Sequence, residues 1–262
     1  MDHKPRKRFG QNFLHDGVII DRIVRAVSPK KGQKLVEIGP GLGALTLPIL
    51  QQLGRLQVVE LDRDLIPRLE KLCADQGELT IHSADALKFD FSALCAENEK
   101  LRLVGNLPYN ISTPLIFHLL QSVDKIHDMH FMLQYEVVRR MAATPGGRDY
   151  GRLSVMCQYY CQVQALFTVR PGAFNPPPKV NSAIVRLTPH TEPLVEVGDV
   201  VLFAKLVRQA FSQRRKTLRN TLKTLLSAAQ IEACDIDPSV RAETLSLAQF
   251  ATLSSYYSEH VS

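Results

Sequence analysis

Short apolar runs alternate with segments of helical periodicity between residues 34 and 187. Between the early runs, apolar side chains recur every three or four residues, as at Leu65, Leu69 and Leu72. Strands that alternate with helices predict βαβ units in a parallel, doubly wound sheet. Helices are predicted at about 44–53, around Leu65–Leu72 and near 114–120. The seven predicted strands are residues 34–38, 56–61, 79–82, 101–105, 129–133, 164–169 and 183–187.

The last two predicted strands differ from the others in what joins them. A proline-rich run, residues 175–178, lies between them, and no helical pattern separates the two. Without a crossover helix the last strand can run antiparallel. A seven-stranded sheet with one reversed strand is typical of a class I methyltransferase, a Rossmann-like α/β fold, rather than of a dehydrogenase.

The pattern changes near Pro189, where prolines and a glycine interrupt it as far as Gly198. Beyond this point the apolar spacing is helical throughout. We therefore predict an α/β catalytic domain over residues 1–190 and a small all-helical domain over residues 191–262. The helical spacing is carried by Leu202, Leu206 and Ala210, and again by Leu218, Leu222 and Leu226.

Charge is concentrated in the predicted helical domain. The chain has 262 residues and a formal net charge of +6, and residues 205–223 carry seven basic side chains and no acidic one. Such a run favours a polyanionic partner, with phosphate contacts from an RNA-binding surface. If one helix continues through the run, Arg208, Arg215, Arg219 and Lys223 share a face. The predicted RNA-binding residues are Arg208, Arg214, Arg215, Lys216, Arg219 and Lys223, with a second basic cluster at Lys4, Arg6, Lys7 and Arg8.

Composition indicates an ordinary globular protein, because hydrophobic residues make up 45% and charged residues 22%. The five cysteines form no C-x-x-C pair, which favours reduced thiols in a cytosolic protein. No run is long enough for a signal peptide or a membrane span. A soluble, cytoplasmic monomer is expected. The eight histidines are scattered, so no metal site is expected.

A glycine-rich turn, residues 39–43, follows the first strand and opens a helix. Gly39 and Gly41 let the backbone approach a ligand without a Cβ in the way. This spacing also satisfies the dinucleotide-binding pattern, so an NAD oxidoreductase is an alternative. The turn alone does not separate the two cofactors.

Acidic residues around the turn favour S-adenosylmethionine over NAD. Glu37, at the end of the first strand, suits an ammonium and a sulfonium but repels a pyrophosphate. Glu60 ends the second strand and can accept hydrogen bonds from ribose hydroxyls. Asp85 follows the third strand and can accept from the adenine amino group, although turns also favour Asp.

The tetrapeptide Asn106-Leu107-Pro108-Tyr109 follows the fourth strand, at the sheet edge where such folds bind ligands. It fits methyl transfer to an adenine amine, whose lone pair is delocalised into the ring. The Asn106 side-chain oxygen and the Leu107 carbonyl can hold the two amine hydrogens. Pro108 stiffens the turn and Tyr109 offers a stacking face. Catalysis of this kind consists mostly of orientation.

These motifs resemble the ribosomal RNA adenine dimethyltransferase family, in particular its bacterial small-subunit branch. The resemblance covers nearly the whole chain. Besides the glycine turn, Asp85 and the tetrapeptide, it rests on residues 8–14, 60–62, 174–180 and 214–220.

The resemblance implies roles that spacing left open. Asn12 and Leu14 would close over the cofactor, with Gly39, Glu60, Asp85 and Asn106 as further cofactor contacts. Phe174 would be a second stacking ring opposite Tyr109, whereas from the residues alone a core aromatic is equally plausible. The implied substrate is a pair of adjacent adenines in a hairpin loop near the 3′ end of 16S rRNA, each dimethylated in the small subunit during ribosome biogenesis.

Two alternatives remain at this stage. One is a large-subunit rRNA methyltransferase of the macrolide-resistance type, which shares the glycine turn and the N-x-P-Y logic. The other is a non-catalytic RNA-binding assembly factor that kept the fold. The loop at residues 145–151 is either a gate for the substrate or, as the composition favours, a plain mobile loop.

Overall fold

The computed structural model describes residues 11–260, which form two compact units. The first unit holds residues 11–138 and 164–189, and the second holds residues 139–163 and 190–260. The predicted domain boundary near residue 190 coincides with one of these junctions. The second unit additionally contains residues 139–163, which the sequence pattern placed in the catalytic domain. Within residues 11–260, no helix has the length and apolar character needed to cross a membrane.

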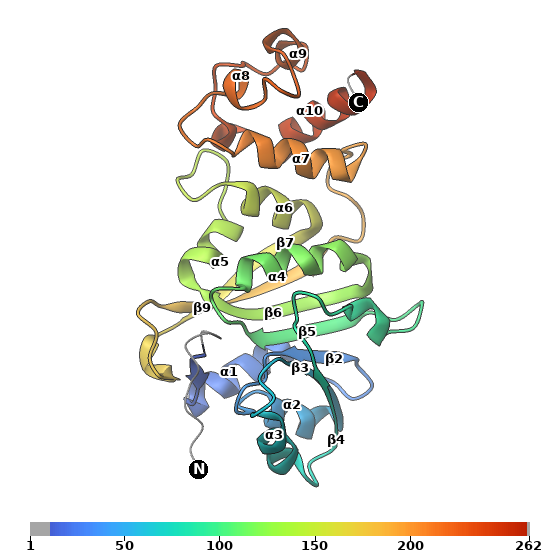
Figure 1. Cartoon of the computed structure of the whole chain (residues 1–262), viewed down its shortest axis with the longest axis vertical. Helices are drawn as coiled ribbons and strands as arrows, with labels where there is room; N and C mark the ends of the chain where they lie inside the picture. Colours follow the sequence, from blue (N-terminus) through green and yellow to red (C-terminus); the bar gives the residue numbers. More distant parts are fainter. Residues whose placement is uncertain (1–10, 261–262) are drawn as a thin grey trace. The chain divides into compact units, whose positions relative to one another are not determined.

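A seven-stranded sheet forms the centre of the first unit (Figure 1). Its order is β4-β3-β2-β5-β6-β9-β7; strands β2 to β6 pair in parallel, and β9 pairs antiparallel with β6. The predicted seven strands and reversed last strand are therefore present. The strands are β2 (Leu35–Ile38), β3 (Arg55–Glu60), β4 (Glu78–Ser83), β5 (Leu101–Asn106), β6 (Ile126–Gln134), β7 (Cys161–Val169) and β9 (Ser182–Pro189).

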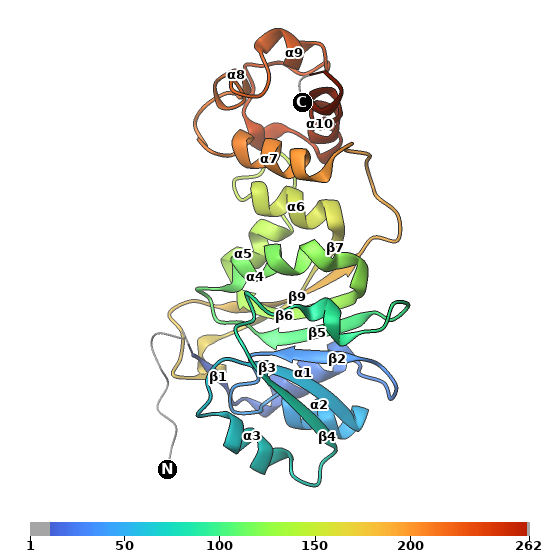
Figure 2. The same cartoon turned by 45° about the vertical axis from the view of Figure 1, so that its right-hand side comes forward.

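Helices α1 and α2 cover one face of this sheet, and the two views in Figures 1 and 2 agree on their place beside β2 and β3. Ile23 and Val27 of α1 and Ile49 of α2 are fully or almost fully buried against β2 and β3. Alternate strand residues point to opposite faces, so the central strands are apolar throughout. The helices of this unit are α1 (Gly17–Val27), α2 (Thr46–Leu53), α3 (Ile66–Cys73) and α4 (Ser112–Leu119), with 3-10 turns η2 (Phe91–Leu94), η3 (Leu120–Lys125) and η4 (Pro171–Ala173).

A two-stranded ribbon lies outside the main sheet and was not predicted. Strand β1 (Phe13–Leu14) pairs antiparallel with β8 (Phe174–Asn175), with Leu14 opposite Phe174. Two-residue strands give no periodic signal, so sequence patterning cannot find them. The ribbon joins the N-terminal segment to the segment just before the proline-rich run.

The second unit is helical, and aromatic contacts hold its core together. Tyr159 packs against Phe203 with ring centroids 4.8 Å apart, and Phe211 packs against Phe250 at 5.6 Å. The junction between residues 138 and 139 falls inside helix α5, so the first residues of this helix belong to the first unit. The helices are α5 (Tyr135–Met141), α6 (Arg152–Tyr160), α7 (Val200–Ala210), α8 (Leu218–Thr221), α9 (Ala228–Glu232) and α10 (Leu247–His260), with the 3-10 turn η5 (Ala242–Thr244).

The basic run does not lie on one continuous helix, which was the condition for its cations to share a face. Helix α7 ends at Ala210, and α8 begins only at Leu218. The Leu218 N–H bonds to the Val240 carbonyl and the Arg219 N–H to the Pro238 carbonyl, at 2.8 and 3.0 Å. Tertiary partners thus replace the intrahelical acceptors, and Arg208, Arg215, Arg219 and Lys223 do not share one helix face.

The loop at residues 145–151 is fastened within the second unit. The Gly146 N–H donates to the Glu243 carbonyl at 2.7 Å, and Arg214 donates to the Arg148 carbonyl. Tyr150 is buried and its ring lies 6.2 Å from that of Phe211. These contacts attach the loop to the second unit at Gly146, Arg148 and Tyr150, and its role stays a prediction.

Candidate functional site

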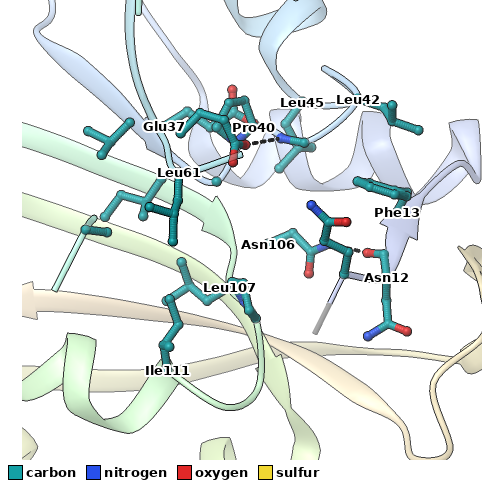
Figure 3. A pocket seen from close by; sticks show the side chains of 18 of the residues that line it. Asn12, Phe13, Glu37, Pro40, Leu42, Leu45, Leu61, Asn106, Leu107 and Ile111 are labelled. Carbon is teal, nitrogen blue, oxygen red and sulfur yellow. Dashed lines mark hydrogen bonds between the residues drawn. The ribbon is translucent and has the colours of Figure 1, made fainter. Parts of the chain in front are cut away.

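A cavity of about 320 Å³ opens at the carboxyl ends of β2, β3 and β5 (Figure 3). Doubly wound sheets bind ligands at this edge, and the volume lies within the range of small-molecule sites. The N-terminal segment, the glycine turn, the ends of β3 and β4 and the tetrapeptide after β5 all contribute to its lining. Every lining residue lies between residues 11 and 111, so the first unit supplies the whole cavity.

The glycine turn brings backbone to the cavity wall, as predicted. Gly39 and Gly41 have φ values of +68° and +59°, a conformation that L side chains rarely adopt. A Cβ at Gly41 would also lie 3.2 Å from the Phe13 ring. Any other residue at position 41 would be strained in its backbone conformation and tightly packed against Phe13.

Glu60 ends β3 at the cavity, and its carboxylate is held by two backbone donors. Oε2 accepts from the Gly41 N–H at 3.1 Å, and Oε1 accepts from the Asp62 N–H at 2.8 Å. Each oxygen keeps a second lone-pair direction, which suits a vicinal diol such as ribose. Burial raises the pKa of Glu60, against the lowering effect of the backbone donors at Asp62 and Gly41.

Glu37 lies in the cavity wall with only 2% of its surface exposed. Burial, opposed by the Thr46 hydroxyl and reinforced by the Glu60 carboxylate, raises its pKa to about 8. Its Oε2 has no hydrogen-bond partner among the described residues. A buried acid with an unsatisfied oxygen fits a ligand that brings a positive charge, so the residues present suit S-adenosylmethionine.

Asp85 lines the cavity from the turn after β4. Its Oδ1 accepts from the Leu87 N–H at 3.0 Å, so it is a turn residue, yet it also faces the ligand space. Leu42 and Leu61 line the same cavity and remain 40% and 49% exposed. Large apolar side chains left open at a cavity suit a flat apolar group, as an adenine ring provides.

Asn106 is the last residue of β5, and its amide orientation is defined by a neighbour. The Nδ2 group donates to the Asn12 carbonyl oxygen at 2.9 Å, the contact drawn as a dashed line in Figure 3. Oδ1 accepts no hydrogen bond from residues 11–260. The Leu107 N–H donates to the Met132 carbonyl at 3.2 Å. The Leu107 carbonyl accepts no backbone hydrogen bond from residues 11–260.

Tyr109 lines the cavity and is half-buried. Its hydroxyl and the Ser182 hydroxyl, at the start of β9, are 2.7 Å apart. Burial raises the pKa of Tyr109, so the phenol keeps its proton at neutral pH. The hydrogen bond fixes the ring at the end of the tetrapeptide, where Pro108 precedes it.

Phe174 does not line the cavity. It is 3% exposed and packs in the core formed with Leu14, Ile23 and Ile184. This burial favours the interpretation of Phe174 as a core aromatic. The stacking role stays a prediction, and it requires the ring to be uncovered when substrate binds.

The N-terminal segment is part of the site. Asn12 and Leu14 line the cavity, as the family resemblance implied, although residues 8–10 of the same motif lie outside the described residues. Sequence reasoning missed a tether beside them: the Gln11 Nε2 group donates to Asp62 Oδ2 at 3.0 Å. An acid two residues after Glu60, at the same strand end, was the available signal.

The predicted RNA-binding residues belong to the second unit, and all of them are exposed. Arg208 lies on α7, whereas Arg214, Arg215 and Lys216 lie in the turn that follows it. Arg214 is within 3.5 Å of the Glu243 carboxylate. The cluster at residues 4–8 lies outside the described part of the chain.

A family model described as ribosomal RNA adenine dimethylase matches residues 2–259. A protein from Pseudomonas aeruginosa, named ribosomal RNA small subunit methyltransferase A, is 60% identical over 257 residues, 98% of this chain and 96% of that one. A protein of the same name from Nitrosococcus oceani is 57% identical over 257 residues, 98% of this chain and 97% of the other.

Two solved structures are similar over nearly the whole chain. A dimethyladenosine transferase from Plasmodium falciparum has a TM-score of 0.79 and 27% identity, covering 92% of this chain and 95% of that one. The 23S rRNA methyltransferase ErmE has a TM-score of 0.72 and 24% identity, covering 95% and 100%. The latter shows a shared fold.

The comparisons agree with the geometry of the cavity. They confirm the predicted class I methyltransferase fold and the predicted enzyme class, a methyltransferase. They also confirm S-adenosylmethionine as the methyl donor and exclude the oxidoreductase alternative. Because the family model and the close relatives each span almost all of it, the chain belongs to the ribosomal RNA adenine dimethylase family.

Proposed function

We propose that this protein dimethylates the exocyclic amino groups of two adjacent adenines in the 3′-terminal hairpin loop of 16S rRNA. The observation that carries the proposal is the end of β5, where Asn106 and Leu107 both line the cavity and neither the Asn106 Oδ1 atom nor the Leu107 carbonyl accepts a hydrogen bond from residues 11–260. The names of the relatives support the small subunit as the source of the RNA.

The residues would act mainly by orientation. S-adenosylmethionine supplies an electrophilic methyl group on a sulfonium. Asn106 Oδ1 and the Leu107 carbonyl accept hydrogen bonds from the two amine hydrogens, which directs the nitrogen lone pair toward the cofactor pocket. No strong base is needed, because the alkylated amine is acidic and loses its proton to water.

The remaining pocket residues would bind the cofactor or the base. Glu60 receives the ribose hydroxyls, Glu37 the positive charge and Asp85 the adenine amino group, with Asn12, Leu14, Gly39, Gly41 and Asn106 forming the rest of the wall. Tyr109 stacks on the flipped adenine, and Phe174 is proposed as the opposite ring. Removing a base from its stack costs a few kcal/mol, and stacking on an aromatic ring returns about 1–3 kcal/mol.

The second unit would bind RNA phosphates. Its exposed cations supply affinity and orientation rather than sequence choice. The proposed division is a catalytic domain over residues 1–190 and an RNA-binding domain over residues 191–262, working as a monomer in the cytoplasm during ribosome biogenesis. The structure adds residues 139–163 to the helical part.

The proposal is tested by incubating the protein and S-adenosylmethionine with unmethylated small subunits and, separately, with large subunits. Mass mapping should find two adjacent dimethyladenines near the 3′ end of 16S rRNA. The Asn106→Ala variant should bind the subunit normally but lose most of its turnover, because the lost contact acts in the transition state. Methylation of large-subunit RNA instead would establish the macrolide-resistance alternative, and no methylation at all would favour the assembly factor.

A further inference from the structure

The segment of residues 11–14, here called the strap, is fixed to the cavity at several points. Phe13 and Leu14 pair with β8 through the ribbon, and the Phe13 ring covers Gly41. Gln11 bonds to Asp62, and the Asn12 carbonyl accepts from Asn106. The strap therefore touches both the cofactor side and the target-base side of the cavity.

Asp62 is well placed to hold the first residue of the strap. It is 2% exposed, and its Oδ2 accepts the Gln11 Nε2 hydrogen bond while Oδ1 accepts from the Asp64 N–H at 3.3 Å. Its own N–H donates to Glu60. Hydrogen bonds to a buried carboxylate are stronger than neutral ones, so this tether resists opening of the strap.

The next residue of the strap determines which end of the Asn106 amide faces the cavity. An Asn side chain can turn about its last torsion, exchanging its oxygen and nitrogen with little change in shape. The Asn12 carbonyl accepts only from nitrogen, so it holds Nδ2 and leaves Oδ1 on the other side. If the Asn106 amide were reversed, its Nδ2 group would face the target amine in place of Oδ1. Nδ2 is a donor, so the amine hydrogen would then have no acceptor on Asn106.

We propose that Gln11 and Asp62 are positioning residues for methyl transfer: their hydrogen bond holds the strap so that the Asn12 carbonyl keeps Asn106 Oδ1 directed at the target amine. This inference rests on the proposed function, in which Asn106 orients that amine. Asp62 does not line the cavity, and Gln11, which does, would act on the reaction through its bond to Asp62. Their effect reaches the reaction through one backbone carbonyl and one side-chain amide.

An exchange of partners tests the tether. Gln11→Glu sets a second carboxylate against buried Asp62 and should release the strap. Asp62→Asn, added to it, offers an amide N–H to the carboxylate introduced at residue 11 and keeps an oxygen for the Asp64 N–H, so it should restore the contact. Gln11→Ala removes the bond to Asp62 without adding a charge and should act in the same direction more weakly.

Two readouts separate positioning from general stability. The kcat of Gln11→Glu on small subunits should fall roughly tenfold, the scale of one hydrogen bond to a charged group, while KM for the subunit changes less than about twofold. In the protein without cofactor, amide hydrogen exchange at residues 12–14 should speed up to a similar extent. Both effects should largely disappear in the Gln11→Glu, Asp62→Asn double variant.

The matched control is Gln51→Glu, the same change at an exposed glutamine of α2 whose partner is Gln76. It should leave both readouts at the parent level. Unchanged kcat and exchange in Gln11→Glu would overturn the inference, as would a folded double variant that recovers neither. Failure of the proposed function looks different, because the parent protein itself would then not methylate small subunits.

Discussion

Burial is the main factor that sets the protonation state of Glu37 in the protein without cofactor. A pKa of about 8 means that the acid holds its proton at neutral pH in the protein without cofactor, although the sequence alone suggests an anion at this strand end. A cationic ligand beside Glu37 favours the ionised form. In the proposed binding mode, cofactor binding and proton release at this one residue are therefore linked.

The linkage gives a pH dependence for binding. Affinity for S-adenosylmethionine should rise as the pH increases from about 6 toward 8, and binding should release a proton below that pH. Calorimetry in buffers of different ionisation enthalpy measures the released proton. Glu37→Gln should bind more weakly and release none, and a pH-independent parent would contradict the assignment.

The same group makes a second, opposite contribution to folding. Its pKa is raised from 4.5 to about 8 in the folded state, so the folded chain binds the extra proton between these values. The stabilisation associated with this proton is complete below about pH 4.5 and is lost as the pH rises through 8. Glu37→Gln should therefore flatten this part of the stability profile without cofactor.

At the scale of elements, the position of the tetrapeptide to which we assign catalysis depends on the contact between β5 and β2. A Cβ at Gly105 would lie 2.4 Å from the Ile38 carbonyl oxygen. This oxygen belongs to the backbone of β2, so moving it away would disturb the strand and cost stability. Gly105→Ala should lower the free energy of unfolding by about 1–3 kcal/mol, the usual cost of overpacking. Turnover should fall too, because Asn106 is the next residue on the displaced strand.

Thermal unfolding and single-turnover methylation measure these two effects. Gly17→Ala is the matched control, because Gly17 begins α1 with no atom within 4 Å of an added Cβ. It should keep parent turnover and equal or slightly exceed parent stability. Normal turnover in a folded Gly105→Ala variant would show that strand spacing does not position Asn106.

At the scale of the molecule, segments distant in the sequence combine their charges. Arg152 of α6 and Arg208 of α7 lie close together: partial burial of its guanidinium lowers the pKa of Arg152 most, and the Arg208 charge lowers it further. Both side chains are exposed. Two neighbouring arginines suit a phosphate group, because its oxygens accept hydrogen bonds from the paired N–H donors of each guanidinium.

The Arg152→Gln, Arg208→Gln double variant should bind small subunits more weakly at low salt. Its salt dependence should flatten by about 0.7–0.9 log units for each lost phosphate contact. Cofactor affinity should stay at the parent value, since the first unit supplies the cavity. Lys30→Gln with Lys31→Gln removes the same charge before β2, at the sheet edge opposite the cavity, and should preserve the slope. Equal slopes in all variants would exclude this surface from RNA binding.

The sequence by itself determined the features that depend on local pattern. The hydrophobic pattern and the turn-forming residues located all seven strands of the sheet, the glycine turn and the reversed β9 to within a few residues. The tetrapeptide after β5 was recognisable as a candidate because its residue types and its strand-end position together fit the proposed chemistry. Family motifs placed Asn12 and Leu14 at the cavity, where the structure has them.

Only the tertiary structure decided the features that depend on partners far away in the chain. The segment after the end of α7 takes hydrogen bonds from Pro238 and Val240, and Phe174 is buried in a core that includes Leu14, Ile23 and Ile184. The neutral Glu37 and the Gln11–Asp62 tether likewise need distant residues to approach. Such contacts produce no periodic pattern of hydrophobic and polar residues, so the sequence does not reveal them. The exclusion of solvent and the geometry of the hydrogen bonds arise only when the chain has folded.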